Sequence, residues 1–344
     1  TIMLELGPDE KAKYPFLTDA GKYLKDKGFP LVQFGTDPDL KSSVEKAFHR
    51  LKVSTEGGIY KSDLIDGQAS KSYVLEREVF SFLLAIVLIK LTGMNTLVKR
   101  FALAEARRAE QHLEKDLVNA ADKSKIDLAI RIIFDLFGIE VTKQNEFFVI
   151  PVSDYIKHSV TFHEREWKLI NRHVENGKVF LTPDKTVRLI RKELGSYISS
   201  KIINAPTPPM IPGFENYVDE LVSICKKLTP SYTVTSGEHP PCIKHAIEVL
   251  EKGENLPHSG RFMLAAFLLS KGQSVEQIAP LFKNAPDYNE RVTLYQLNHL
   301  AGTSGSGTQY SCPSCEKLKT QNLCFIAPAC DNIINPLQFG KKRK

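Results

Sequence analysis

The spacing of apolar and polar positions predicts helices along most of the first 204 residues. Residues 73–92 are strongly apolar and end at Thr92-Gly93, which predicts a buried core helix. Other ranges mix polar and apolar side chains with a helical spacing, and these are 9–27, 38–54, 95–118 and 124–137. The Gly-, Ser- and Asp-rich residues 54–72 predict a loop. Within 95–118 we expect an exposed charged face, carried by Glu105, Arg107, Arg108, Glu110 and Glu114.

Two short stretches carry the pattern of strands. Phe147, Phe148, Val149 and Ile150 directly precede Pro151 and predict a short strand. Asn176-Gly177, a dipeptide typical of hairpin turns, precedes apolar residues 179–181 and predicts a second small β element. The next helix should begin at Pro183-Asp184. One apolar stripe on it predicts contact within the core or with another subunit, and it is formed by Val187, Ile190, Leu194, Tyr197 and Ile198.

The clearest predicted linker is the segment 205–213, which contains Pro206, Pro208, Pro209 and Pro212. Proline at this density disfavours a helix and gives a stiff, extended connection. Further helices are predicted at 214–228, 242–252, 258–271, 274–283 and 287–300. We therefore predict a mostly α protein with a helical N-terminal domain that contains a small β element (1–204), a proline-rich linker (205–213) and an all-α C-terminal domain (214–344).

Composition narrows the class of protein. The chain has 344 residues, of which 42% are hydrophobic and 25% charged, as in ordinary globular proteins. The longest apolar run, Val79–Ile89, is well short of the roughly 20 residues that a membrane-spanning helix needs. No basic-then-apolar leader opens the sequence, so we expect an intracellular protein without membrane contact. The net charge of +6 is too slight to indicate nucleic-acid binding by itself.

All six cysteines lie in the last part of the chain, at Cys225, Cys242, Cys312, Cys315, Cys324 and Cys330. In an intracellular protein this clustering favours thiolate ligation of a metal ion or an iron–sulfur cluster. Only Cys312 and Cys315 form a close pair, so the spacing leaves the type of centre open. Free buried thiols that pack as small hydrophobic groups are the simpler alternative.

Several motifs beyond residue 238 resemble, in order and spacing, the iron–sulfur domain at the C-terminal end of the archaeal and eukaryotic DNA primase large subunit. They are Pro240-Pro241-Cys242-Ile243, the segment Asn255-Leu256-Pro257-His258-Ser259-Gly260-Arg261-Phe262, Pro286-Asp287-Tyr288-Asn289-Glu290, Tyr295-Gln296-Leu297-Asn298-His299, Tyr310-Ser311-Cys312-Pro313-Ser314-Cys315, Leu323-Cys324, Cys330 and Asn335-Pro336-Leu337. Residues 1–204 resemble the family's N-terminal domain more loosely, through Tyr14-Pro15-Phe16-Leu17 and Trp167-Lys168-Leu169-Ile170-Asn171-Arg172. The short chain resembles the archaeal form.

The resemblance implies one [4Fe–4S] cluster as cofactor. Its ligands would be Cys242, Cys315, Cys324 and Cys330, with Cys312 and Cys225 as additional thiols. Cys315 is preferred to Cys312 because the family's ligand ends the Tyr-x-x-Pro-Ser-Cys segment. Four thiolates from three separate segments would join the start, middle and end of the domain.

The resemblance also implies a non-catalytic subunit that binds the single-stranded DNA template, the RNA primer 5′ end and the initiating nucleoside triphosphate. It places His258, Arg261, Tyr295, Gln296 and His299 at or near the template–primer surface. Arg291 on the same predicted helix offers another cation, and Tyr310, like Tyr295, offers a ring that can stack on a base or sugar. For each of these residues, the alternative to nucleic-acid binding is an ordinary surface or helix-capping role.

In this family the catalytic centre lies in the small subunit, and the N-terminal domain of the large one docks it. Tyr155 and Ile156 resemble the exposed apolar docking patch, with a buried loop anchor as the alternative. A carboxylate pair at Asp37-Pro38-Asp39 is better explained by helix capping than by metal-dependent catalysis. We expect an intracellular location, which would be the cytoplasm or nucleoid if the source is an archaeon.

Three other functions compete with this hypothesis. The first is a nucleic-acid-binding scaffold stapled by zinc on Cys312, Cys315, Cys324 and Cys330. The second is an iron–sulfur redox enzyme, although the chain has no Gly-rich dinucleotide fingerprint. The third is a purely structural scaffold of a replication complex, which would lack the salt dependence that phosphate contacts produce.

Overall fold

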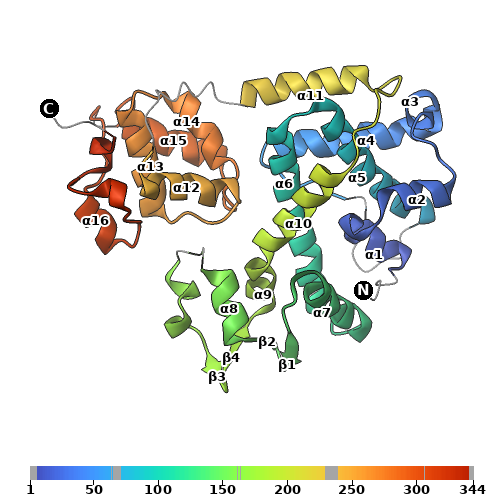
Figure 1. Ribbon diagram of the computed structural model, residues 1–344, viewed down its shortest axis with the longest axis horizontal. Coiled ribbons are helices and arrows are strands. Elements are labelled where there is room, and N and C mark those ends of the chain that lie inside the picture. The colour runs from blue at the N-terminus through green and yellow to red at the C-terminus, as the bar shows by residue number, and fades with distance from the viewer. Residues whose placement is uncertain are drawn as a thin grey trace. The chain divides into compact units, whose positions relative to one another are not determined.

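The computed structural model describes residues 6–62, 64, 71–160, 162, 164–228, 239–305 and 307–340, and it is mostly helical with one small antiparallel sheet (Figure 1). The predicted fold class is thereby confirmed. The chain divides into two compact units. The first comprises Thr1–Pro151 and Lys178–Leu228, and the second comprises Val152–Gly177 and Thr229–Lys344. Within the described residues, no helix combines the length and apolar character needed to cross a membrane.

The first unit is organised around the apolar helix α5 (Ser72–Thr92), which is buried along most of its length. Helix α4 (Pro38–Thr55) packs on it, and so do α1 (Pro8–Lys13) and α11 (Glu215–Leu228). The remaining helices of this unit are α2 (Ala20–Lys27), α3 (Gln33–Thr36), α6 (Asn95–Leu117), α7 (Lys123–Phe137), α9 (Pro183–Leu189) and α10 (Arg191–Asn204). The helices predicted at 38–54, 73–92, 95–118 and 124–137 are therefore confirmed to within a residue or so at either end.

The predicted helix over 9–27 is instead three pieces. Helix α1 ends at Lys13, a single 3-10 turn covers Pro15–Leu17, and α2 begins at Ala20. Proline at position 15 lacks the N–H that would continue the helix, so the chain turns there. Asp19 then caps α2 by accepting a hydrogen bond from the Lys22 N–H at 2.8 Å. Asp37 caps α4 in the same way, through the Asp39 N–H at 2.9 Å, which confirms the capping role of that pair.

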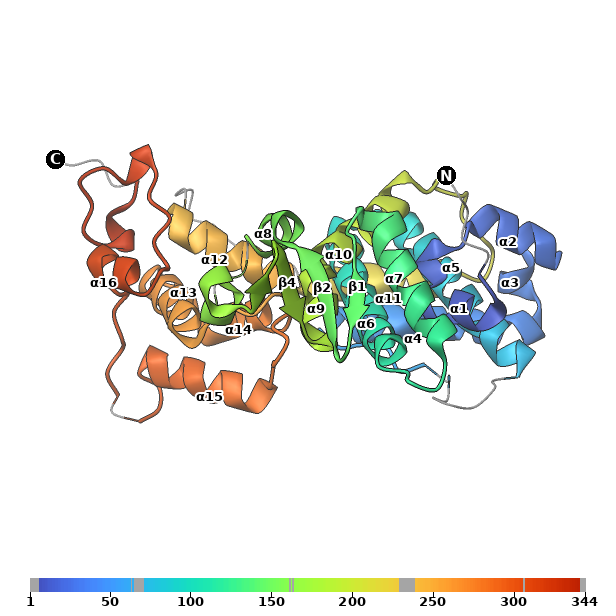
Figure 2. The same cartoon turned by 90° about the horizontal axis from the view of Figure 1, so that it is seen from below.

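The sheet has the order β1-β2-β4-β3. Figure 2 shows β1, β2 and β4 side by side. Strands β1 (Thr142–Gln144) and β4 (Lys178–Leu181) flank β2 (Phe147–Pro151), and Phe148 lies opposite Leu181. Strand β3 (Val174–Glu175) lies at the edge, joined to β4 by Asn176-Gly177. Both of these turn residues have positive φ, 50° and 73°, as a tight hairpin turn requires. Both predicted β elements are confirmed.

The sequence predicts an exposed charged face on α6, and this prediction is wrong for four of its five residues. Glu105, Arg107, Arg108 and Glu110 are buried, and Glu114 is half-buried. The reason is that α4, α9 and α10 all pack against α6, and that Arg50 of α4 and Arg191 of α10 pair with Glu105 and Glu110. Helical periodicity shows which residues share a face of the helix. Whether that face is exposed to solvent depends on the packing of helices that are distant in the sequence.

These charges form a buried network centred on Arg50 of α4. Its guanidinium donates two hydrogen bonds of 2.6 Å to the Glu105 carboxylate and one of 3.0 Å to the Ser81 hydroxyl. Arg108 donates to the backbone carbonyls of Ala12 and Lys13 at 3.0 and 2.9 Å. Burial lowers the pKa of Arg108 to about 10, with repulsion from Arg50 adding to it. The network ties α1, α4, α5 and α6 together.

The proline-rich segment is part of the first unit. Ile211 and Phe214 are buried, and the backbones of residues 35 and 213 come so close that only glycine fits at either. A Cβ on Gly35 would lie 1.8 Å from the Pro212 carbonyl oxygen. Helix α11 beyond the segment packs on α4 and α5. The predicted division at 205–213 therefore differs from that of the structure, which groups α11 with the N-terminal helices and ends the first unit at Leu228.

Residues 239–340 form the all-α part of the second unit, as the sequence predicts. Helix α13 (His258–Ser270) is its centre, and residues 263–269 are all buried. Around it lie α12 (Pro241–Glu251), α14 (Val275–Phe282) and α15 (Glu290–Ala301). Helix α16 (Cys315–Thr320) and 3-10 turns at Pro328–Cys330 and Pro336–Gln338 complete this part. The sequence did not predict α16.

The same unit includes residues 152–177, with α8 (Val152–Ser159) and 3-10 turns at Arg165–Trp167 and Leu169–Asn171. An aromatic stack holds this segment together. Trp167 stacks on Phe162 with ring centroids 4.2 Å apart and on Tyr155 at 6.3 Å. The Arg172 guanidinium lies 4.7 Å from the Trp167 ring centroid.

Candidate functional site

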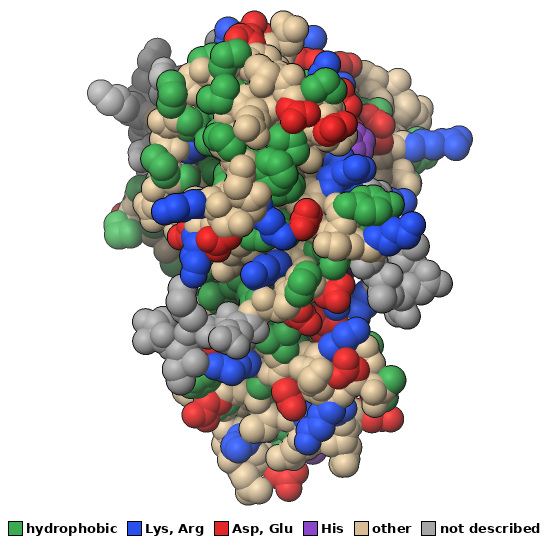
Figure 3. Space-filling view, turned by 90° about the vertical axis from the view of Figure 1, so that its right-hand side faces the viewer, with side chains coloured by type: hydrophobic (Ala, Val, Ile, Leu, Met, Phe, Trp, Pro, Cys, Tyr) green, Lys and Arg blue, Asp and Glu red, His purple; other side chains and the backbone are tan. Residues whose placement is uncertain are grey.

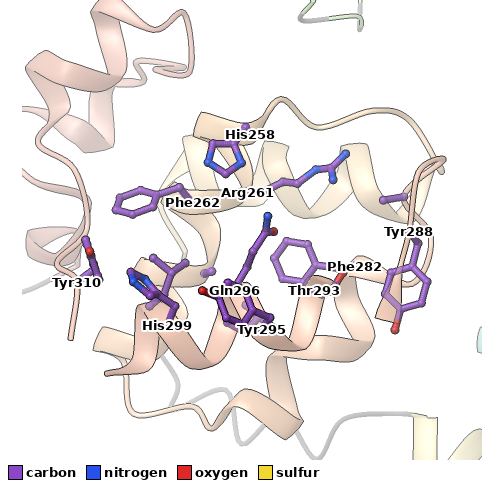
Figure 4. A pocket seen from close by; sticks show the side chains of 14 residues that line it. His258, Arg261, Phe262, Phe282, Tyr288, Thr293, Tyr295, Gln296, His299 and Tyr310 are labelled. Atoms are coloured by element: carbon purple, nitrogen blue, oxygen red, sulfur yellow. The ribbon is translucent and has the colours of Figure 1, made fainter. Parts of the chain in front are cut away.

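A cavity of about 350 Å³ opens between α13 and α15 (Figure 4). Helix α13 begins at His258, directly after Pro257, and α15 begins after Asn289, whose side chain accepts a hydrogen bond from the Val292 N–H at 3.1 Å. The two helices pack against each other and against α14, which places their first turns beside the cavity. Its inner wall is apolar and is formed by Phe262, Ala265, Phe282, Ala285, Leu297 and Leu300.

The structure brings together six of the seven residues predicted to bind nucleic acid or nucleotide. They line this cavity and are His258, Arg261, Tyr295, Gln296, His299 and Tyr310. In Figure 4 the Gln296 side chain points into the space between the two helices. Arg291, on the first turn of α15, is exposed and lines neither this cavity nor its neighbour.

A second, polar cavity of about 290 Å³ adjoins the first. The two cavities share four lining residues, namely His258, Arg261, Thr293 and Gln296. The polar cavity also includes residues that lead into both helices, namely residues 255–257 before α13 and Asp287 and Asn289 before α15. Helix N-termini present free N–H groups and favour anions, so this cavity combines backbone donors with a guanidinium.

Arg261 is held firmly at the boundary of the two cavities. Its Nε donates to the Leu256 carbonyl at 2.7 Å, and its Nη2 donates to Asn255 Oδ1 at 2.7 Å and to Asp287 Oδ1 at 2.6 Å. The side chain of Arg261 is 23% exposed and that of Asp287 is 63% exposed. These three bonds fix the plane of the guanidinium and leave its Nη1 edge as the part not used in them.

Aromatic rings line the mouth of the first cavity. Tyr310 lies 5.3 Å from the His299 ring and 5.9 Å from the Phe262 ring, measured between centroids. Tyr295 is 67% exposed and lies 6.5 Å from His299. Flat rings at an open mouth are the means by which proteins hold unpaired bases.

The sequence interpretation missed several residues of the two cavities. Asn255, Asp287 and Tyr288 lie within the motifs that carry the resemblance, but nothing in the sequence indicated that the first two would hold Arg261. Phe282 and Ala285 come from the end of α14 and the turn after it. Their only signal was apolar character, which is shared by every core residue.

The four proposed cluster ligands line one further pocket, although they come from separate segments. Cys242 lies in the first turn of α12 and Cys315 opens α16, while Cys324 and Cys330 follow in the loop and the 3-10 turn beyond. None of them is in a disulfide. Cys312 is buried and is not among the residues that line this pocket. Within the residues that the structure describes, no group of three or more His, Cys, Asp or Glu is arranged to hold a metal ion.

Thiols are the donor type that soft metal centres use, although the described residues of the structure do not arrange these four as a metal site. Burial is the main cause that raises the pKa of Cys242 to about 12. The neighbouring thiols of Cys324, Cys315 and Cys330 contribute in the same direction, and the Ile243 N–H opposes them. Burial likewise raises the pKa of Cys315, with Cys324 and Cys330 adding to it. Thiols crowded in this way ionise together only when a cation offsets their mutual repulsion.

The predicted docking residues differ in exposure. Tyr155 is fully buried, donates a hydrogen bond to the Trp167 carbonyl at 2.7 Å and accepts one from Arg172 Nε at 2.9 Å. It is therefore an anchor inside its segment. Ile156 is exposed, and so are Val160 and Ile170 nearby in the sequence.

These features together define a helical protein whose second unit contains a cation- and aromatic-lined cavity and a pocket lined by four cysteines. Residues 232–340 match the model of the C-terminal domain of the eukaryotic and archaeal DNA primase large subunit. The DNA primase large subunit PriL of Methanocella arvoryzae is 31% identical over 338 residues, which cover 96% of this chain and 87% of that protein. PriL of Methanosarcina barkeri is 31% identical over 96% of this chain and 78% of its own length. PriL of Halobacterium salinarum is 28% identical over 95% of this chain and 91% of its own length. This chain belongs to the DNA primase large subunit family.

Proposed function

We propose that the chain is the regulatory large subunit of a heteromeric DNA primase in DNA replication. It binds the template and the 5′-triphosphate of the initiating nucleotide for a small subunit that performs the nucleotidyl transfer. The observation that supports this most strongly is the cavity between α13 and α15, where cationic, amide and aromatic side chains from separate motifs converge.

Starting a strand is difficult because two nucleotides must meet on the template without an existing duplex to hold them. A protein that fixes one of them contributes by positioning alone. Here Arg261 and the first turns of α13 and α15 offer donors to phosphate oxygens, while the rings of Tyr295 and Tyr310 offer stacking surfaces. This division of work requires no catalytic group in the large subunit.

The test is the binding of a short RNA–DNA duplex with a 5′-triphosphate or a 5′-hydroxyl on the RNA, followed by fluorescence anisotropy. We expect tighter binding of the triphosphate end and an affinity that falls linearly with salt on logarithmic axes. Tyr295→Ala should weaken binding about 5- to 100-fold, as expected for the loss of one stacked ring. Tyr73→Ala removes a comparably exposed tyrosine (56%) from α5 and serves as the matched control.

Equal binding of both ends, together with an unchanged affinity of Tyr295→Ala, would contradict the proposal. It would favour the scaffold alternative, in which other parts of a complex bind the nucleic acid.

In this proposal, the [4Fe–4S] cluster is held by four cysteines, namely Cys242, Cys315, Cys324 and Cys330. Their convergence on one pocket from separate segments supports it, as does the softness of four thiol donors. When bound, the cluster would supply four iron–thiolate bonds that cross-link α12, α16 and the C-terminal loop. Because ligation energy in such sites is also folding energy, residues 239–340 should be much less stable without it.

Anaerobic purification followed by absorption, iron and sulfide analysis tests this assignment. We expect a brown wild-type protein with about four iron atoms per chain. The colour and the iron should be lost in Cys242→Ser and kept in Cys225→Ser and Cys312→Ser. Cys225 is a suitable control because it is also buried but lies on α11 in the first unit. A colourless protein with one zinc ion that depends on Cys312 and ignores Cys242 would replace the cluster with the zinc alternative.

The surface around Ile156 docks the small subunit in this proposal, with Tyr155 as its internal anchor. Exposed apolar side chains at Ile156, Val160 and Ile170 support this assignment. Ile156→Asp should weaken co-purification with the small subunit, whereas Val118→Asp, an equally exposed valine outside this segment, should not. Association that is unaffected by Ile156→Asp would move the interface elsewhere.

A further inference from the structure

The loop that follows α16 carries two of the four cysteines that line the cysteine pocket, Cys324 and Cys330. This loop is buried at its two ends, at Leu323 and Pro336, whereas residues 324–335 are half-buried or exposed. Segments with so few buried side chains are the ones that open most readily in a folded protein. The two thiols therefore depend on a further contact to stay in place.

Such a contact joins the loop to α12. The rings of His245 and Phe325 stack with centroids 3.9 Å apart and an interplanar angle of 30°. Phe325 directly follows Cys324 and lines the pocket, whereas His245 is not among the lining residues and supports the Phe325 ring from outside. His245 also lies three residues after Cys242 on α12, a spacing that places two side chains on one face of a helix. One stack thus connects the helix that carries one thiol to the loop that carries two others.

We propose that His245 is a positioning residue for the cysteine pocket, whose stack on Phe325 holds the loop closed and keeps water and dioxygen from the proposed iron–sulfur cluster. The inference rests on the proposed function and deepens it, since it concerns the protection of the cofactor and not its identity. Residues that orient metal ligands without touching the metal typically change metal affinity or activity about 10- to 100-fold when they are removed. Because His245 acts through Phe325, position 245 requires an aromatic ring and not a nitrogen atom.

The surroundings of Phe325 show why its position matters. Ile326, the next residue along the loop, also lines the pocket and is 73% exposed. The pocket therefore lies at the surface, and an outward movement of this part of the loop would bring water to the thiols beside it. Apolar side chains around a metal site control solvent access and thereby the redox potential. Without the stack we expect faster attack by dioxygen and a changed potential.

The first measurement uses the full-length chain, purified without oxygen and then exposed to air while its visible absorbance and released iron are followed. His245→Ala should lose the cluster about tenfold faster than the wild type. His245→Phe keeps a ring that can stack and should match the wild type, whereas His245→Gln keeps a polar N–H without a ring and should match His245→Ala. His239→Ala is the matched control, because His239 is also half-buried but its ring contacts Phe267, at 5.7 Å, and should leave the rate unchanged.

The second measurement tests whether the two rings act as one unit. Phe325→Leu should accelerate cluster loss about as much as His245→Ala, and the double variant should be no faster than either, because one contact can be lost only once. The reduction potential should become more positive in both single variants, since admitted water stabilises the more negative reduced form. A purely structural role would leave the potential of the intact cluster unchanged. Circular dichroism checks folding, and the half-exposed Phe325 keeps the test available if His245→Ala does not fold.

Equal rates of cluster loss in an iron-loaded wild type and His245→Ala overturn the inference. Rescue by His245→Gln but not by His245→Phe also overturns it and assigns His245 a hydrogen-bonding role. Effects that multiply in the double variant would show that the two rings act independently, with the same consequence. A wild type without iron is a different result, because it contradicts the proposed cofactor itself and the inference falls with it.

Discussion

Two arginine–carboxylate pairs in this protein have the same shortest N–O distance and opposite surroundings. Arg50 and Glu105 meet at 2.6 Å with side chains that are 0% and 2% exposed, inside the helical core of the first unit. Arg261 and Asp287 also meet at 2.6 Å, but at the edge of a cavity in the second unit. The first pair is completed by its protein neighbours, whereas the hydrogen bonds of Arg261 use its Nε and Nη2 but not its Nη1. The two pairs therefore differ in burial and in the donors that remain unused, and not in distance. Only the second has the features of the ligand-binding role that we propose for it.

Figure 3 extends the comparison to the surface. On the face that it shows, basic and acidic side chains are interspersed without a continuous basic stripe. Clustered positive charge is the usual mark of a nucleic-acid-binding surface. In this protein the proposed contacts are instead gathered in a small cavity, so the overall charge is a poor guide to where they lie.

Arg50→Ala should have the largest effect on stability, because it leaves Glu105 charged and buried without its partner. We expect the free energy of unfolding of the first unit to fall by about 3–5 kcal/mol in denaturant titrations. The matched control is Arg131→Ala, which removes an exposed arginine from its 3.5 Å pair with Asp135 and should cost at most about 0.5 kcal/mol. Similar losses in the two variants would show that burial does not distinguish these pairs.

Arg261→Gln should act mainly on binding. Loss of the charge removes charge-assisted hydrogen bonds to phosphate and should weaken the triphosphate-ended duplex by about 1.5–3 kcal/mol, that is, about 10- to 100-fold. Stability should fall by less than in Arg50→Ala, since the side chain is partly exposed and its neighbours can be hydrated. A variant that unfolds but binds normally when folded would reverse the roles of the two pairs.

The buried network should also give the first unit a pH dependence through His112 of α6. Burial, together with repulsion from Arg108 and Lys13, lowers the pKa of His112 to about 2. The unfolded chain takes up the proton near pH 6.5, so the contribution to stability is present above that pH and is lost as the pH falls below it. We expect a loss of about 2 kcal/mol between pH 6.5 and 4.5.

His112→Gln should flatten that part of the stability profile, measured by denaturant titration at each pH. His49→Gln removes an exposed histidine and should leave the slope as in the wild type. An unchanged slope in His112→Gln would contradict this role of His112.

The smallest effect is expected for Lys52→Ala. Lys52 pairs with Glu220 at 3.2 Å between α4 and α11, but both side chains are well exposed. Solvent screens such pairs, so the loss should be about 0–0.5 kcal/mol in the same titration. A loss above about 1 kcal/mol would mean that this contact, and not the apolar packing of α11, holds that helix to the first unit.

Local sequence patterns predicted most helices and both β elements, because each depends on neighbours along the chain. The hairpin at Asn176-Gly177 is an example, since its residues tolerate the positive φ that the turn needs. The pattern failed where long-range packing intervened. The proline-rich segment was predicted as a linker, yet the close approach of Gly35 and Gly213 fastens it to the first unit, and no local signal indicates that contact.

The candidate site shows the same limit. His258, Arg261, Tyr295 and Gln296 were found through motif resemblance, and the structure then placed them around one cavity. Arg291 belongs to the same helix as Tyr295 and has the same charge as Arg261, but it faces solvent outside both cavities. Residue type and helix membership were known from the sequence, whereas the direction of each side chain relative to a second helix was not.

By itself, the amino-acid sequence determined the mostly α class, the positions of most helices and strands, and the motifs that identify the family. The tertiary structure decided that the charges of α6 are buried, that α11 belongs with the N-terminal helices and that Arg261 is held by Asn255 and Asp287. Secondary structure follows from interactions a few residues apart. Burial, by contrast, is set by surfaces that meet from distant parts of the chain, and it decides whether a charge stabilises the fold or remains available to a ligand.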